Sequence, residues 1–115
     1  MHDIKHELKK FLSEEELMGI STCLGNKPWS STVFFTTDNF LDLYFVSRTN
    51  SRHSKEIEKN MFISGTIYSK SKDFGQVKGL QFEGKVAKTD ELEIEKVFHL
   101  FKNKFENFGA IYPSV

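Results

Sequence analysis

The chain has 115 residues, of which 28% are charged and 38% hydrophobic, a composition typical of one globular domain with a single core. Its formal net charge is zero, whereas a nucleic-acid binder normally carries a basic excess, so composition argues against that class of partner. The single cysteine, Cys23, cannot form an internal disulfide, which predicts a reducing, cytoplasmic setting. The charged N-terminus lacks the apolar core of a signal peptide, and no apolar run is long enough to span a membrane.

Hydrophobic periodicity predicts three helices and five strands. The first helix is predicted over residues 2–15, where apolar residues recur at helical spacing. Runs rich in β-branched and aromatic residues, separated by turn residues, predict strands at 17–24, 29–37, 41–47, 61–69 and 77–88. A second helix is predicted from Ser51 to Asn60, and a third begins at Thr89 or Asp90. A polar loop is predicted from Lys70 to Gln76.

Five strands joined by tight turns indicate a mainly β fold with few helices, in one domain spanning residues 1–115. A small antiparallel barrel is favoured because short strands would otherwise leave open edges. Gly84, in the middle of the last strand, is typical of a bulge or a bend. The last helix is predicted to bury a stripe of apolar residues, with His99 partly buried beside it. The stripe consists of Ile94, Phe98, Phe101 and Phe105.

The start of the second helix is a candidate anion site. Its exposed backbone N–H groups and the positive end of its dipole suit an anion such as a phosphate. Ser51 or Thr49 is the expected cap. Cationic donors follow within one turn, at Arg52, His53 and Lys55. The alternative is an ordinary capped surface helix with basic residues near its start, which is the commoner case when the local sequence is taken alone.

A second group of polar residues lies early in the strand 29–37, at Ser30, Ser31 and Thr32. In a strand with one buried face, adjacent polar residues put at least one hydroxyl on the buried side, where it needs a partner. A cofactor's phosphate or polyol would supply that partner, and a solvated strand edge is an equally good explanation. Gln81, on the polar face of the last strand, is able to hydrogen-bond a heterocycle.

No set of residues indicates hydrolytic or metal chemistry. Cys23 lies in a strand-like run without an activating helix start, and the adjacency of His53 and Ser54 is no evidence of a nucleophile–base pair. There is no glycine-rich dinucleotide fingerprint, Walker-type loop or cysteine pair for zinc. No catalytic or metal-binding residue is therefore predicted, and an enzyme of this kind takes its chemistry from a cofactor.

Four segments in order resemble a known family: PWSSTVFF, LDLYFVS, TNSRHSKEIEKN and GLQFEGKV. They are similar to the pyridoxamine 5'-phosphate oxidase-like, FMN-binding split-barrel superfamily, and the resemblance runs from about Leu17 to Phe105. Its most specific part is the pair of SRHSK, at 51–55, and GLQFEG, at 79–84. Within the superfamily the chain looks closest to a group of small bacterial proteins that share these two motifs.

The resemblance implies a split barrel of five to six antiparallel strands and a homodimer with two FMN sites at the subunit interface. The FMN phosphate would be held at the start of the second helix, by Ser51, Arg52, His53 and Lys55. The isoalloxazine and ribityl groups would lie along the second strand, against Ser30, Ser31, Thr32 and Val33. The set of expected cofactor-binding residues is completed by Ser47 and Thr49 beside the helix and by Gln81 from the strand that often reaches the partner subunit.

The chain departs from the oxidase at three places. Gln81 stands where the oxidase has an arginine, and the oxidase's C-terminal substrate-binding strand has no counterpart, so oxidation of pyridoxamine phosphate is not expected. The sequence ends at Val115, where relatives continue into a sixth strand. Either the chain is truncated there or its barrel closes differently, with help from a partner chain.

Three functions follow from the sequence. The leading hypothesis is an FMN-dependent oxidoreductase acting on a small molecule, with substrate and electron donor unspecified. The second keeps the fold but binds the deazaflavin F420 or haem, for which His53 and His99 are the internal candidates for an axial ligand. The third is a non-enzymatic dimeric binding protein with a lost cofactor site. None of the three involves nucleic acid or a membrane.

Overall fold

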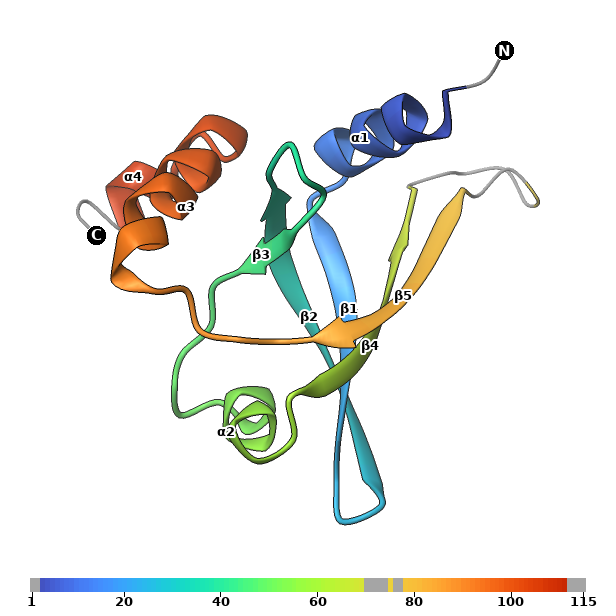
Figure 1. Ribbon diagram of the computed structural model, residues 1–115, viewed down its shortest axis with the longest axis vertical. Helices are drawn as coiled ribbons and strands as arrows, with labels where there is room; N and C mark the ends of the chain where they lie inside the picture. The colour runs from blue at the N-terminus through green and yellow to red at the C-terminus, as the bar shows by residue number, and fades with distance from the viewer. Residues whose placement is uncertain (1–2, 70–74, 76–77, 112–115) are drawn as a thin grey trace. The chain divides into compact units, whose positions relative to one another are not determined.

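The computed structural model describes residues 3–69, 75 and 78–111, which form five strands and four helices (Figure 1). In chain order these are α1 Ile4–Glu14, β1 Leu17–Leu24, β2 Lys27–Thr37, β3 Leu43–Phe45, α2 Arg52–Lys59, β4 Phe62–Tyr68, β5 Gly79–Lys85, α3 Glu91–Lys104 and α4 Phe108–Ile111. The strands pair in the order β3-β2-β1-β4-β5, and every pairing is antiparallel. The predicted mainly β fold with flanking helices is confirmed.

Most predicted elements are found, and the differences lie at their ends. β1 has the predicted bounds, and Ser51 and Asp90 cap α2 and α3 as predicted. β2 begins two residues earlier than predicted, and β3 is confined to three residues. The short helix α4 was not predicted. The predicted loop lies outside the described residues apart from Gly75, as does the first residue of the predicted last strand.

Two compact units make up the chain. The sheet unit comprises Leu17–Phe34 and Val46–Ala87, and the helical unit comprises Met1–Glu16, Phe35–Phe45 and Lys88–Val115. Within the described residues, the sheet unit contains β1, β4, β5, α2 and most of β2, whereas the helical unit contains the other three helices, β3 and the end of β2. None of the helices in the described residues is long and apolar enough to cross a bilayer.

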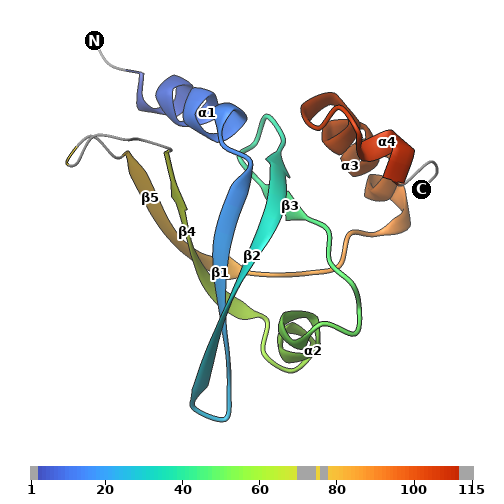
Figure 2. The ribbon, with the colours of Figure 1, turned by 180° about the vertical axis from the view of Figure 1, so that it is seen from behind.

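The sheet unit has one buried and one exposed face, as strand alternation requires. The buried residues of the inner face are Met18, Ile20, Val33, Ile63 and Ile67. Phe82, on β5, lays its ring over Gly65 of β4, to which it is paired. The register of β4 with β5 is continuous through Gly84, which excludes the bulge from the two predicted alternatives, a bulge or a bend. Figure 2 shows the long β1–β2 hairpin with α2 beside it, an arrangement that a hydrogen bond between α2 and β1 fixes.

The helical unit is built on stacked aromatic rings. Val97, Phe101 and Phe108 form its buried cluster, and the rings of Phe101 and Phe108 stack with centroids 5.1 Å apart. The predicted stripe on α3 is wrong at one position, because Ile94 is 44% exposed and Val97 is buried instead. His99 is exposed rather than partly buried, with its ring edge-on to Phe98.

Lys104 joins the two longer helices of the helical unit. Its Nζ donates to the carbonyl of Leu12, near the end of α1, at 3.0 Å and lies 4.0 Å from the centre of the Phe35 ring. Burial lowers the pKa of Lys104 to about 8, although the carboxylates of Glu15 and Glu16 limit the shift. The ammonium group is thus held by a helix C-terminus and an aromatic face, both of which favour a cation.

Asp38 ties the turn after β2 to α3. Its carboxylate accepts hydrogen bonds from the Tyr44 hydroxyl at 2.8 Å, from the Lys96 ammonium at 3.2 Å, and from the backbone N–H groups of Phe40 and Asp42. Burial raises the pKa of Asp38, but these hydrogen bonds outweigh it and leave the pKa below its ordinary value. Burial, together with the hydrogen bond to Asp38, raises the pKa of the Tyr44 hydroxyl.

Replacing Asp38 with asparagine is expected to lower the free energy of unfolding by about 2 kcal/mol at pH 7, because one acceptor oxygen becomes a donor facing other donors. A carboxylate with a depressed pKa stabilises the fold above its ordinary pKa of about 4, and that stability is lost as the pH falls through the lowered value. Urea unfolding at pH 7 and pH 3 should therefore show a smaller difference between wild type and Asp38→Asn at pH 3. The exposed Asp42→Asn is the control, and an equal loss there would contradict the assignment.

Candidate functional site

Local hydrogen bonds fix the start of α2. The Ser51 side chain accepts from the backbone N–H of Ser54 at 3.3 Å, and the Ser51 carbonyl accepts from the N–H of Lys55. Upstream, the Arg48 carbonyl accepts from both the N–H and the hydroxyl of Ser51. The helix therefore begins directly after Ser51, whose side chain caps it by accepting a hydrogen bond from an N–H group of the first turn.

Three hydroxyls and an imidazole converge on this helix start. We call Ser47, Ser51, His53 and Ser54 the hydroxyl cluster. The Ser47 Oγ lies 3.1 Å from the Ser51 Oγ and 2.9 Å from the Ser54 Oγ, and it is hydrogen-bonded to His53 Nε2. Ser51 and Ser54 are joined at 2.8 Å, and Ser51 lies 3.3 Å from the same ring nitrogen. The cluster thus gathers polar hydrogens from two segments at the positive end of a helix dipole.

Partial burial lowers the pKa of His53, so its imidazole is neutral at pH 7. A neutral imidazole carries one donor and one acceptor nitrogen, and each serine hydroxyl is able to donate or accept. The cluster therefore has adaptable hydrogen bonds, which reorganise readily around an acceptor such as a phosphate oxygen.

The Arg52 side chain lies outside the hydroxyl cluster and contacts Glu56 and Trp29 instead. Its Nε donates to the Glu56 carboxylate at 2.9 Å, and its guanidinium carbon lies 4.0 Å from the centre of the Trp29 ring. Glu56 also accepts from the Thr22 hydroxyl at 2.7 Å. Beside this group is an open cleft of about 380 Å³, lined by Leu24, Asn50, Arg52, Lys55, Glu56 and Lys59.

The hydroxyls of β2 divide between the two faces of the sheet. Ser31 shares the inner face with the buried Val33, and its Oγ is buried with no hydrogen-bond partner among the described residues. Ser30 and Thr32 lie on the outer face and are exposed, and the Ser30 Oγ lies 3.3 Å from the Ser21 Oγ. Because an unpaired buried hydroxyl is unfavourable, Ser31 is a point at which a bound polar group would be accommodated after rotation about one side-chain torsion.

Comparison with known protein families identifies the family of this chain. A family model described as pyridoxamine 5'-phosphate oxidase matches residues 4–112. The chain belongs to the pyridoxamine 5'-phosphate oxidase family. Among curated relatives, a UPF0306 protein from Cronobacter sakazakii is 26% identical over 106 residues, which cover 90% of this chain and 72% of the relative. A UPF0306 protein from Photorhabdus laumondii is 23% identical over 84 residues, which cover 72% of this chain and 59% of the relative.

Solved structures share the split-barrel fold of the family. HutZ, a haem storage protein from Vibrio cholerae, has a TM-score of 0.77 at 18% identity, over 99% of this chain and 84% of HutZ. A FAD-binding protein from Mesorhizobium loti has a TM-score of 0.73 at 12% identity, over 96% of this chain and 78% of its own. A haem-binding protein from Mycobacterium smegmatis has a TM-score of 0.82 at 11% identity, over 100% and 48%. At these identities the likeness shows the fold alone.

The oxidase-family residues expected at the cofactor fall into separate groups in the structure. Ser47, Ser51 and His53 meet in the hydroxyl cluster, where Ser54 joins them. Arg52 and Lys55 line the cleft instead, and Thr49 is exposed in the loop before α2. Of the β2 residues, Ser31 and Val33 share the inner face, whereas Ser30 and Thr32 lie on the outer face. Gln81 is exposed on the outer face, opposite Thr66.

Two residues that contact Arg52 were not expected from the sequence to do so. Trp29 and Glu56 contact Arg52, and Glu56 is buried although it is charged. The spacing of Arg52 and Glu56, four residues apart on a helix, was the available signal for their pairing. Within the described residues, no group of three or more histidine, cysteine, aspartate or glutamate side chains is placed to bind a metal.

Proposed function

We propose that this chain is an FMN-binding oxidoreductase whose FMN phosphate lies in the hydroxyl cluster. The observation that carries the proposal is the convergence of three serine hydroxyls and His53 Nε2 on the N-terminus of an eight-residue helix. A phosphate is an acceptor with two negative charges, and this arrangement supplies donors and a positive dipole end without a fixed counter-charge. Membership of a flavin-binding fold family supports the same ligand.

The rest of the cofactor would follow β2. Ser31 would hydrogen-bond the ribityl or ring, and Val33 would pack against its apolar part. Bound FMN would supply the electron transfer itself, and the protein would hold the phosphate, orient the ring and exclude water from one of its faces. We infer no catalytic acid or base in the chain, and the single cysteine fits a reducing compartment such as the cytoplasm.

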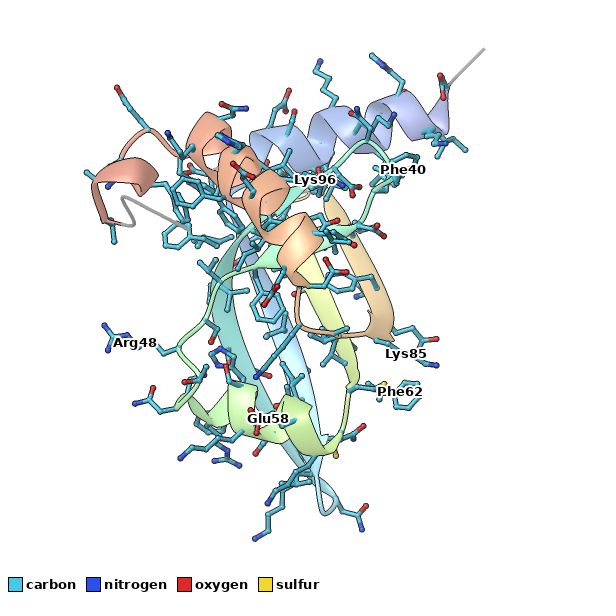
Figure 3. All side chains as sticks on the ribbon, turned by 60° about the vertical axis from the view of Figure 1, so that its left-hand side comes forward. Phe40, Arg48, Glu58, Phe62, Lys85 and Lys96 are labelled. Carbon is cyan, nitrogen blue, oxygen red and sulfur yellow. The ribbon has the colours of Figure 1, made fainter. Side chains whose placement is uncertain are left out.

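A second copy of the chain is the proposed partner, seated on the outer face of the sheet unit. This face exposes large apolar side chains, among them Phe62 at 60% and Tyr68 at 67% exposed. Phe62 and Lys85 project side by side from β4 and β5, with the Lys85 Nζ 5.3 Å from the ring centre (Figure 3). Gln81 lies on this face and would reach the partner's flavin from it. Exposed apolar area of this kind typically marks an interface.

Haem is the second candidate ligand, because HutZ and the mycobacterial protein bind haem. The exposed His99 would be its axial ligand, since His53 is engaged in the hydroxyl cluster.

The substrate of the flavin protein is proposed to be a small molecule other than pyridoxamine phosphate. The deazaflavin F420 is an alternative to FMN in this proposal, and its phosphate would occupy the same hydroxyl cluster.

The absorption spectrum of the purified chain tests these ligands directly. We expect flavin bands in the protein as isolated or after reconstitution, a micromolar or tighter dissociation constant for FMN, and a dimer by light scattering. A Soret band would identify haem as the ligand in place of FMN, and a band near 420 nm would identify F420. No flavin binding at micromolar FMN would contradict the proposal, and the further absence of haem and F420 would favour a non-enzymatic binding protein.

A further inference from the structure

Lys104 is a partly buried amine that the proposed flavin site does not use. Its side chain runs from the last turn of α3 to the end of α1, where Nζ donates to the Leu12 carbonyl at 3.0 Å. Leu12 carries one of the last four carbonyls of α1, and carbonyls at these positions lack a partner within their own helix. Lys104 therefore caps α1 from a helix that lies far away in the sequence.

The surroundings of this amine are poor in hydrogen-bond acceptors. Nζ lies 4.0 Å from the centre of the fully buried Phe35 ring and 5.7 Å from the centre of the Phe105 ring. Among the described residues, no carboxylate forms an ion pair with Lys104, and Glu15 and Glu16 act on it only at longer range. One carbonyl and two aromatic rings replace only part of the hydration that the ammonium loses.

Deprotonation of Lys104 is compatible with its contacts. An ammonium group has three N–H donors and no acceptor, whereas a neutral amine keeps two N–H donors and gains a lone pair. One N–H is then able to go on donating to Leu12 while the lone pair reacts. Burial lowers the pKa of Lys104 to about 8, against the opposing carboxylates of Glu15 and Glu16, so about one amine in ten is unprotonated at pH 7. An ordinary lysine, with a pKa of about 10.4, has fewer than about one in a thousand unprotonated.

We propose that Lys104 is an acylation site, at which an acyl phosphate transfers its acyl group to Nζ and so weakens the attachment of α1 to α3. The lone pair of Nζ attacks the acyl carbon and forms an amide bond, while the bond from that carbon to the phosphate oxygen breaks. Inorganic phosphate leaves, and the nitrogen loses its surplus proton to water. Desolvation of a lysine in an apolar setting is a general way to activate it as a nucleophile. The proposal is independent of flavin binding.

Acylation would change the contact between the two helices. The amide has one N–H and no charge, so it loses the attraction of the ammonium to the C-terminal end of α1 and to the Phe35 ring. The acyl group also needs space beside Phe35 and the Leu12 carbonyl. The acylated chain should therefore open more often at α1.

Competition between lysines of one helix tests the reactivity. The purified chain is treated with limiting acetyl phosphate at pH 7, and acetyl-lysines are quantified by peptide mass spectrometry. We expect Lys104 to be acetylated at least about tenfold faster than Lys102, which is exposed on α3 with its Nζ 5.7 Å from the Phe98 ring. This factor is smaller than the ratio of unprotonated amines, because nucleophilicity falls with basicity, as it does for thiols.

The pH profile gives a second signature. The preference for Lys104 should shrink between pH 7 and pH 9.5, because Lys104 is by then almost fully unprotonated while ordinary lysines still gain unprotonated amine. Equal rates at Lys104 and Lys102 at pH 7, or a preference that does not change with pH, would overturn the proposal.

Two sets of variants test the surroundings and the consequence. Glu15→Gln combined with Glu16→Gln removes carboxylates that favour the ammonium, so acetylation of Lys104 at pH 7 should be at least about twofold faster. Glu7→Gln, at the other end of α1, is the control and should leave the rate unchanged. After acetylation, amide hydrogen exchange in α1 should be faster in the wild type than in Lys104→Arg, which keeps the cation but cannot be acetylated. A slower rate in the double variant, or α1 exchange that acetylation of Lys104 leaves unchanged, would contradict the proposed site or its effect.

Discussion

Replacing Gly65 with alanine is expected to lower the free energy of unfolding by about 3 kcal/mol, the upper part of the range for overpacked cores. A Cβ atom at this position would lie 2.2 Å from Cζ of Phe82 and 2.7 Å from the carbonyl oxygen of Gly19. The Phe82 ring is able to move, but the Gly19 oxygen belongs to the backbone of the neighbouring strand β1. Any relief must therefore separate β4 from a strand to which it is hydrogen-bonded.

Gly84→Ala is the matched control for Gly65→Ala. Gly84 lies on β5, and a Cβ there would meet no atom of the described residues within 4 Å, so the change should fall within about 0.5 kcal/mol of wild type. Urea unfolding followed by circular dichroism measures all variants. Adding Phe82→Leu to Gly65→Ala should recover only part of the loss, because the contact with Gly19 remains. Equal midpoints for the two alanine variants would show that the sheet adapts freely at Gly65.

Replacing Ser54 with aspartate is expected to weaken FMN binding by at least about 100-fold, because a like charge placed against a bound phosphate costs several kcal/mol. The Ser54 hydroxyl lies within 2.9 Å of both other hydroxyls of the cluster. Ser54 is also the third residue of α2, where an acidic side chain stabilises a helix through the dipole and the exposed N–H groups. The variant therefore removes phosphate binding while leaving the helix at least as stable as before.

Thr89→Asp is the matched control for the charge. It adds the same negative charge beside the start of another helix, α3, at an exposed position in the helical unit. Calorimetry with FMN, alongside thermal unfolding of each variant, separates loss of binding from loss of fold. FMN affinity unchanged in Ser54→Asp would place the phosphate elsewhere, and the cleft lined by Arg52 would be the next site to examine.

Neighbouring residues of α2 make different contacts. Ser51, His53 and Ser54 form an adaptable seat at the helix start, whereas Arg52 and Glu56 form a held ion pair on the side of α2 that meets the β1–β2 hairpin. The serine hydroxyls accommodate a phosphate by rotating about single bonds. An arginine contributes most to binding affinity when its side chain is already ordered.

The sequence was sufficient for features set by short-range physics. The bounds of β1, the cap at Ser51 and the alternation of the strands follow from turn residues, cap chemistry and period-two patterns, all of which act within a few residues. The motifs SRHSK and GLQFEG led to the right family for the same reason, because they are local strings, and both lie within the residues that the family model matches. The phosphate site at the start of α2 stays a prediction from the sequence.

Only the tertiary structure decided which side chains act together. Arg52 and Ser51 are adjacent in sequence, yet Arg52 faces Glu56 and Trp29 because β1 and β2 bring Thr22 and an aromatic ring to that side of α2. Likewise Ser31, and not Ser30 or Thr32, has the buried hydroxyl, because the register with β1 fixes which face of β2 is covered. Val97 rather than Ile94 is buried on α3, since the cluster with Phe101 and Phe108 sets the buried side. Each choice depends on a partner distant in the sequence, which a local pattern does not contain.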